Sequence, residues 1–146
     1  MNKIEFEDSD FFFYLPETWH VLPEMEESKD NLIRISSLNN EAGAATIHLV
    51  AQVDPEASID LVKIMEDTLS DNKITAEIKQ INQNTIFCEY LVDEGDGPLW
   101  MKRWLMIRKY YLIDALYSCY LTSIEKETEV LEKIMSSICI SPSEIN

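Results

Sequence analysis

The two histidines, His20 and His48, are the side chains best suited to proton transfer or zinc binding near neutral pH. If the fold brought them together beside a carboxylate, they could hold zinc, or one of them could act as a general base. They are 28 positions apart, and this spacing matches no HExxH motif and is accompanied by no C-x-x-C pair. We therefore expect ordinary histidines in a strand and a turn. The alternative is a small hydrolase or ligand-binding enzyme that uses His20 or His48.

The three cysteines, Cys88, Cys119 and Cys139, lie inside apolar segments that are typical of strands. An odd number of cysteines in such surroundings favours buried thiols in a reducing cytoplasm over a disulfide framework. A nucleophilic thiol would need a base and an electropositive setting to lower its pKa, whereas apolar burial raises it. The aromatic neighbours of Cys88 and Cys119 therefore favour inert core thiols.

The acidic stretch 93–97 contains Gly95-Asp96-Gly97, which invites comparison with a phosphate-binding loop. It lacks a third glycine, a lysine and a following helix, so it does not match that motif. Asp93, Glu94 and Asp96 could approach calcium, but an EF-hand needs a longer series of ligands with a bidentate glutamate. We predict a solvated turn, no metal, no cofactor and no enzymatic activity.

Asp114 lies in an apolar segment, Leu112 to Leu116, where a carboxylate must either reach water or be paired. If Arg108 and Lys109 form a two-residue turn, the residue opposite Asp114 is Arg103. The same register sets Trp104 opposite Ile113 and Trp100 opposite Tyr117. We predict a structural ion pair between Arg103 and Asp114. The alternative is a polar anchor in a ligand groove.

The elements that would position these side chains are organised around residues 98–120. This stretch contains two of the three tryptophans, four of the six tyrosines and no glycine, so we interpret it as two adjoining strands. Both faces of each strand are largely apolar. A sheet that is apolar on both faces needs cover on both faces, which helices can supply.

The rest of the chain supplies further strands and two helices. Strand-like segments are residues 3–6, 11–15, 32–38, 44–53, 74–81 and 85–92. Helical spacing follows Ser58, a plausible N-cap, and a capping-box signature of Thr122 with Glu125 opens the last helix. Consecutive hairpins favour antiparallel pairing. We predict a single α+β domain over residues 1–146, with a mainly antiparallel sheet flanked by helices on both faces.

The formal net charge of −15 limits the classes of partner. Such acidity repels nucleic acid and anionic membranes, and it favours a basic or neutral partner. The N-terminal residues lack the basic region and long apolar segment of a signal peptide, and no apolar stretch reaches 18 residues. We expect a cytoplasmic protein that binds neither nucleic acid nor membrane.

Three short features carry a resemblance to a known family: Leu15-Pro16, Trp19, and the terminal Ser136-Ser137-Ile138. Together with the order of elements over nearly the whole chain, they resemble the PsbP-like fold superfamily. That superfamily includes a Ran-binding nuclear-transport protein and the bacterial DcrB-like proteins. The resemblance implies an α/β/α sandwich whose members mostly bind other proteins without catalysis. Some DcrB-like proteins are cytoplasmic chaperones that hold apolar helices of secreted effectors.

We therefore predict a non-catalytic cytoplasmic protein-binding domain, with a partner that is basic or carries an exposed apolar segment. A chaperone for a secreted effector, which would be a homodimer, and an acidic neutraliser of a basic toxin both fit this prediction. Aromatic side chains dominate interfaces where they are exposed. The candidate binding residues are Trp19, which we expect to be exposed, and the neighbouring acidic residues Glu24, Glu26 and Glu27.

Overall fold

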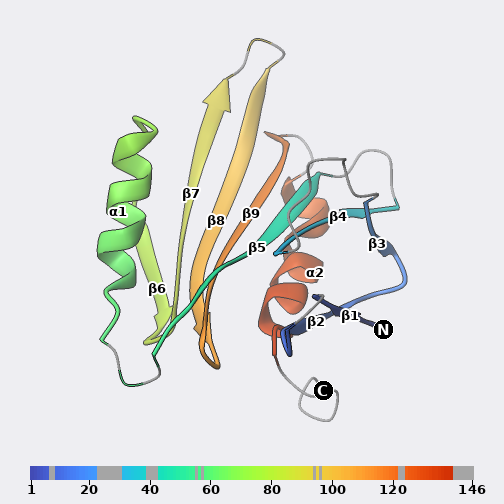
Figure 1. Cartoon of the computed structure of the whole chain (residues 1–146). Coiled ribbons are helices and arrows are strands. Elements are labelled where there is room, and N and C mark those ends of the chain that lie inside the picture. The colour runs from blue at the N-terminus through green and yellow to red at the C-terminus, as the bar shows by residue number, and fades with distance from the viewer. Residues whose placement is uncertain are drawn as a thin grey trace.

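The main sheet is antiparallel, with the strand order β3-β4-β5-β9-β8-β7-β6 (Figure 1). The computed structural model describes residues 1–6, 9–22, 31–38, 43–54, 56, 58–93, 95, 97–121 and 124–139, with the backbone alone for 124–127. In sheet order the strands are β3 (Trp19–Val21), β4 (Leu32–Ser37), β5 (Ala44–Gln52), β9 (Tyr111–Tyr120), β8 (Pro98–Arg108), β7 (Thr85–Asp93) and β6 (Ile78–Asn82). A separate two-stranded hairpin is formed by β1 (Asn2–Glu5) and β2 (Phe12–Leu15).

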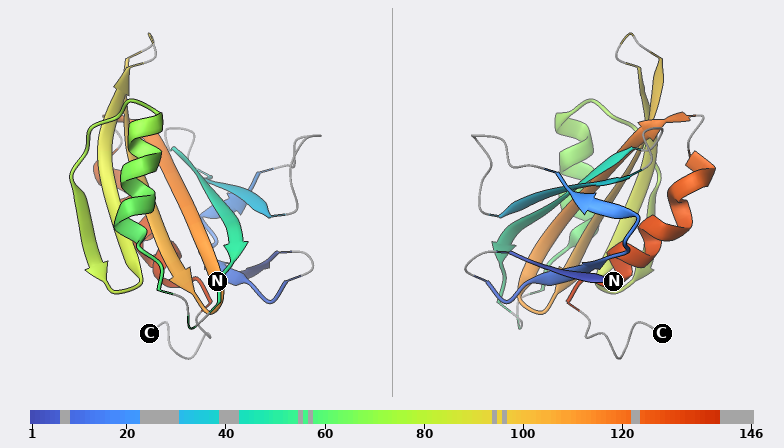
Figure 2. Two further views of the ribbon diagram at one scale, coloured as in Figure 1. Left: turned by 60° about the vertical axis from the view of Figure 1, so that its left-hand side comes forward. Right: turned by 90° about the vertical axis from the view of Figure 1, so that its right-hand side faces the viewer.

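Two helices, α1 (Leu61–Asp71) and α2 (Ile124–Ser136), lie on opposite faces of the main sheet (Figure 2). α1 packs on β7 and β8 through a small cluster that includes Ile86, Cys88 and Leu105. α2 and the β1–β2 hairpin cover the other face, where the larger core gathers. This arrangement confirms the predicted α+β class with a mainly antiparallel sheet. Of the helices described, neither has the length and apolar character needed to cross a membrane.

α1 begins where an acidic side chain caps it. Asp60 accepts a hydrogen bond at Oδ1 from the backbone N–H of Lys63 at 3.1 Å, which satisfies one donor of the first turn. The prediction of Ser58 as the N-cap is therefore wrong by two residues, because the side chain of Asp60 is the one that reaches this donor. The helix is held to the sheet by three buried residues at intervals of four: Leu61, Met65 and Leu69.

The β8–β9 hairpin contains the predicted pair of strands in a different register. Lys109 adopts a left-handed backbone conformation with φ of 54°, so the turn is formed by Lys109 and Tyr110. Leu105 then lies opposite Asp114, and Ala115 lies opposite Trp104. The predicted turn is wrong by one residue. Each residue therefore lies opposite a partner that is two positions away from the predicted one. Because a shift of two keeps each side chain on its face, the assignment of faces is unaffected.

Lys102 is a buried cation, only 6% exposed, between the sheet and α2. Its ammonium group forms ion pairs with Glu132 of α2 and with Glu89 of β7, the latter at 3.7 Å. It also lies 4.5 Å from the ring centre of Phe87 and 5.1 Å from that of Trp104. These contacts replace the water that the charge has lost and fix α2 over the centre of the sheet.

Candidate functional site

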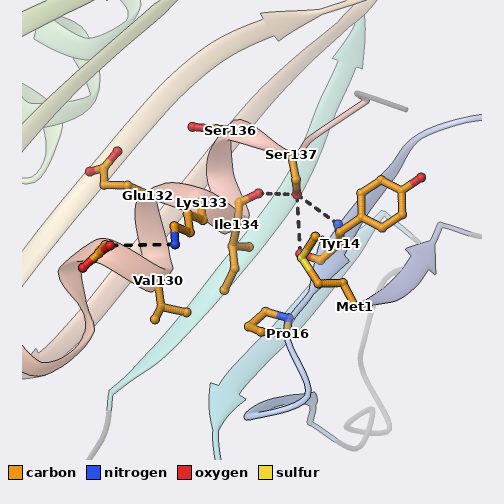
Figure 3. A pocket seen from close by; sticks show the side chains of 10 residues that line it. Met1, Tyr14, Pro16, Val130, Glu132, Lys133, Ile134, Ser136 and Ser137 are labelled. Carbon is orange, nitrogen blue, oxygen red and sulfur yellow. Dashed lines mark hydrogen bonds and ion pairs between the residues drawn. The ribbon is translucent and has the colours of Figure 1, made fainter. Parts of the chain in front are cut away.

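A groove of about 760 Å³ runs between α2 and the β1–β2 hairpin (Figure 3). Val130 and Ile134 of α2 line one side, and Met1, Tyr14 and Pro16 line the other. We call this hollow the α2 groove. Its volume falls in the range of roughly 300–1,000 Å³ that is usual for ligand sites, and its lining is largely apolar.

The end of the α2 groove is closed by hydrogen bonds between the helix and β2. The buried Ser137 hydroxyl accepts from the backbone N–H of Tyr14 at 3.0 Å and donates to the carbonyl of Ile134 at 2.6 Å (Figure 3). The N–H of Cys139 then donates to the carbonyl of Phe12 at 2.8 Å. Because the C-terminal end of α2 is tied to β2 in this way, the two walls keep a fixed spacing.

The rim of the α2 groove carries charge that is open to solvent. Glu129 and Lys133 are four residues apart on α2, with 3.7 Å between Oε1 and Nζ, and their side chains are 88% and 74% exposed. An exposed pair of this kind contributes little to stability, roughly 0–1 kcal/mol. Both side chains can therefore turn toward a bound partner at small cost. Glu132, which also lines the groove, is held by Lys102.

Of the predicted binding residues, only Trp19 lies within the described part of the chain, and it does not line this groove. Trp19 is buried, with 4% of its surface exposed, and belongs to the larger core. The expectation of an exposed Trp19 is therefore wrong: β3 turns this side chain toward the apolar face of the sheet. Glu24, Glu26 and Glu27 lie outside the described residues.

The two histidines lie on the α1 side of the sheet, on strands that β4 separates. His20 on β3 is opposite Ser36, and His48 on β5 is opposite Asp114. Since neighbouring strands are about 4.8 Å apart, the two histidine backbones are on the order of 10 Å apart or more. His48 Nε2 lies 3.3 Å from the amide nitrogen of Asn31. Among the described residues, neither histidine forms an ion pair with a carboxylate, and no group of residues could hold a metal ion.

Arg103 and Asp114 meet on the α1 side of the sheet although they are not directly opposite one another. Arg103 Nε donates to Asp114 Oδ1 at 3.0 Å, and Nη2 donates to Oδ2. Burial lowers the pKa of Arg103, but the hydrogen bonds and charge of Asp114 outweigh it, so the pKa is raised overall. Arg103 and Asp114 thus satisfy one another as a bidentate ion pair.

The thiols lie in surroundings that suppress their reactivity. Burial raises the pKa of Cys88 to about 11, and the Cys88 thiol lies 3.7 Å from the sulfur of Met65. Burial also raises the pKa of Cys139. A thiol becomes nucleophilic when its pKa falls, so neither cysteine is placed for covalent catalysis.

Sequence reasoning did not find the α2 groove. Its walls come from the first 16 residues and the last helix, which are far apart in the chain and share no motif. The helical spacing of Val130 and Ile134 predicts an apolar stripe on α2, but it does not reveal that part of this stripe is left uncovered.

Several solved structures share this fold. The chain is similar to cyanobacterial PsbP from Synechocystis sp. PCC 6803, with a TM-score of 0.63 and 12% identity over 96% of this chain and 92% of that one. It is also similar to the Ran-binding protein Mog1p of Saccharomyces cerevisiae, with a TM-score of 0.67 and 8% identity over 99% and 97%. A protein of unknown function from Pseudomonas aeruginosa gives a TM-score of 0.53 and 8% identity over 97% and 98%.

These similarities confirm the predicted PsbP-like fold. At such low identities they establish the fold and leave function to the site. No protein-family profile and no curated protein matches the sequence.

Proposed function

We propose that this chain is a non-catalytic protein-binding domain whose α2 groove holds an apolar segment of a partner protein flanked by basic residues. The observation that carries the proposal is an apolar-lined groove of about 760 Å³ whose walls are tied together by hydrogen bonds and whose rim carries the exposed charges of Glu129 and Lys133. A preformed groove lowers the cost of ordering the site on binding.

Charge identifies the flanking residues of the partner. The chain has a formal net charge of −15, and its groove is bordered by Glu129, which is highly exposed. A long-range negative field steers basic partners toward the surface and repels acidic ones. The exposed Glu129 can exchange its weak pair with Lys133 for a lysine or arginine of the partner.

The polar groups elsewhere support binding without catalysis. Among the described residues neither histidine forms an ion pair with a carboxylate, the carboxylate of Asp114 opposite His48 is bound by Arg103, and burial raises the pKa of Cys88 to about 11. A hydrolase built on His20 or His48 would need a base oriented by an acid. Mog1p, which shares the fold, is described as a Ran-binding protein, and this supports a partner that is itself a protein.

The lining of the α2 groove favours one of the two partner types over the other. A neutraliser of a basic toxin needs surface charge alone, whereas an apolar hollow is useful for holding an apolar side chain. The function we infer is therefore chaperone-like, with the net negative charge of the chain adding selectivity for basic partners. Cys88, Cys119 and Cys139 are not joined in disulfides, which is consistent with a reducing cytoplasm.

Fluorescent peptides test the proposal. Three labelled peptides share one leucine-rich core and carry lysine, serine or glutamate flanks, and their binding is followed by anisotropy. We expect the lysine-flanked peptide to bind most tightly and to weaken as salt is raised. The serine-flanked peptide should bind less tightly and respond little to salt, and the glutamate-flanked peptide should bind most weakly.

A pair of matched valine variants locates the binding. Val130→Asp places a charge in the α2 groove, while Val50→Asp places the same charge on an exposed position of β5. We expect Val130→Asp to weaken binding of the lysine-flanked peptide by about ten-fold or more. One unpaired buried charge costs more than about 1.4 kcal/mol of binding free energy, which corresponds to that factor. Val50→Asp should bind as the unmodified protein does. Equal binding by both variants would show that the α2 groove is not the site.

A further inference from the structure

A second, smaller hollow of about 250 Å³ lies near α2, between the helix, the end of β6, the start of β7, and β8. Its polar lining includes Trp104, Arg108 and Thr85, and its apolar lining includes Ile81, Met106 and Met135. We call it the Arg108 hollow. It is distinct from the α2 groove, although Glu132 and Ser136 contribute to both.

Trp104 is among the residues that line this hollow, and it carries a buried hydrogen-bond donor. Its side chain is 1% exposed, and its indole N–H has no hydrogen-bond partner among the described residues. A buried donor without an acceptor costs roughly 1–3 kcal/mol, and such groups are uncommon in native proteins. An acceptor brought by a ligand would recover this energy.

Arg108 also lines the hollow, and its guanidinium group is not paired with a carboxylate among the described residues. Its Nη1 donates to Thr85 Oγ1 at 3.0 Å and to the carbonyl of Ile107 at 3.3 Å, and within the described chain it forms no ion pair. The guanidinium group has five N–H donors, so most of its capacity is unused. Burial lowers the pKa of Arg108. The hydroxyl of the buried Thr85 accepts from Arg108 and keeps its own proton to donate.

Among the residues that the structure describes, the charges that line the hollow leave the positive charge of Arg108 without a paired anion. The acidic member of the lining, Glu132, is already paired with Lys102. What remains is a set of donors from Arg108, Trp104 and Thr85. An arginine fork with further N–H and O–H donors matches a carboxylate. The net charge of −15 on the whole chain disfavours an anion with several charges.

We propose that the Arg108 hollow binds a single carboxylate group, with Arg108, Trp104 and Thr85 as its donors and a short aliphatic portion of the ligand against Met106 and Met135. The volume of about 250 Å³ limits the ligand to a small monocarboxylate or to the last residue of a peptide. This inference goes beyond the proposed function and does not depend on it, because the α2 groove takes no part in holding the carboxylate.

Indole N–H signals in ¹H–¹⁵N NMR spectra test the proposal. The chain has three tryptophans, and Trp104→Phe assigns the signal of Trp104 by its disappearance. Sodium butyrate is titrated into the unmodified protein, with butyramide as an uncharged probe of the same shape. We expect butyrate to move the Trp104 signal in a saturable way and butyramide to leave it in place. Absence of a saturable shift with butyrate, or equal shifts with both, would overturn the proposal.

Variants then test the role of the guanidinium group. Arg108→Gln should weaken butyrate binding by about ten-fold or more, because a charge-assisted bidentate contact is lost. Lys63→Gln removes an exposed cation from α1, away from the hollow, and should leave binding unchanged. Unchanged binding by Arg108→Gln would refute the assignment. If Arg108→Gln does not fold, Arg108→Lys replaces it and should also bind butyrate more weakly.

Two short peptides identify the source of the carboxylate. They share the sequence Ala-Ala-Leu, and one ends in a free carboxylate while the other is amidated. A shift of the Trp104 signal with the free peptide alone indicates that peptide C-termini are accepted. A shift with butyrate and with neither peptide indicates a small-molecule site. In both cases the carboxylate proposal stands, and an equal shift with both peptides would contradict it.

Discussion

Arg103 and Asp114 form a two-bonded ion pair that runs diagonally across β8 and β9, with Arg103 Nε 3.0 Å from Asp114 Oδ1. The residue directly opposite Asp114 is Leu105, and the one opposite Arg103 is Leu116. The long arginine side chain therefore spans two positions of register to reach the carboxylate. This contact explains how a carboxylate is accommodated in the apolar segment of β9.

Removal of Arg103 should destabilise the fold. Arg103→Ala leaves the half-buried Asp114 without its two charge-assisted bonds, and we expect a loss of about 2 kcal/mol in the free energy of unfolding. Urea denaturation measures it. The exposed pair of Lys63 and Asp67 on α1 is the control, and Lys63→Ala should cost less than about 0.5 kcal/mol. Equal losses in the two variants would mean that the diagonal pair is not structural.

Gly43→Ala should separate the start of β5 from β9. A Cβ atom at Gly43 would lie 2.0 Å from the carbonyl oxygen of Ser118 and 2.7 Å from Cβ of Cys119. Because the nearest atom belongs to backbone, relief requires the strands to move, and we expect a loss of about 1–3 kcal/mol in unfolding free energy. Ala51→Ser on the exposed end of β5 is the control and should change stability by less than about 0.5 kcal/mol. A neutral Gly43→Ala would show that β5 approaches β9 less closely.

The free energy of unfolding should fall at alkaline pH because the Cys88 thiol loses its proton more readily in the unfolded chain. The thiol has a pKa of 9.0 as its ordinary value and about 11 in the fold, where burial disfavours the thiolate. Between these values the unfolded chain loses its proton while the native state keeps it, so stability is complete below pH 9 and declines as the pH rises through 11. Denaturation of the protein and of Cys88→Ala over this range measures the effect. The decline should be shallower in Cys88→Ala, and identical slopes would contradict this account.

Loss of Lys102 should loosen α2. Lys102→Ala removes the ion pair with Glu132 and the packing against Phe87 and Trp104, and we expect a cost of about 2–3 kcal/mol. Lys102→Met keeps the aliphatic stem and should cost less. Hydrogen exchange should show faster opening of α2 amides in both variants. Lys133→Ala, on the exposed side of α2, serves as the control and should not alter exchange.

The strands around residues 98–120 could be predicted because aromatic and apolar residues fill both faces of each strand, a pattern that few other structures accommodate. The register could not be predicted, since nothing in the sequence shows that Lys109 takes a left-handed conformation. A turn that starts one residue later moves every partner by two.

The candidate site was harder to predict than the fold. Exposure of Trp19 was inferred from nearby acidic residues, but β3 directs its side chain into the core. The α2 groove joins Met1 and Tyr14 to Val130, a juxtaposition that arises from the packing of distant segments. The unpaired indole N–H of Trp104 is likewise a property of packing, which periodicity in the sequence does not report.

The central claim is that the α2 groove holds an apolar segment of a partner protein. The position of a bound peptide on the protein tests this claim most directly. Methyl NMR spectra of the protein, recorded with and without the lysine-flanked leucine peptide, report which surface the peptide covers. The account predicts shifts at Val130, Ile134 and Met1, which line the α2 groove, and none at Val50 on β5. Shifts confined to Val50 and the α1 side of the sheet, with Val130 and Ile134 unmoved, would contradict it.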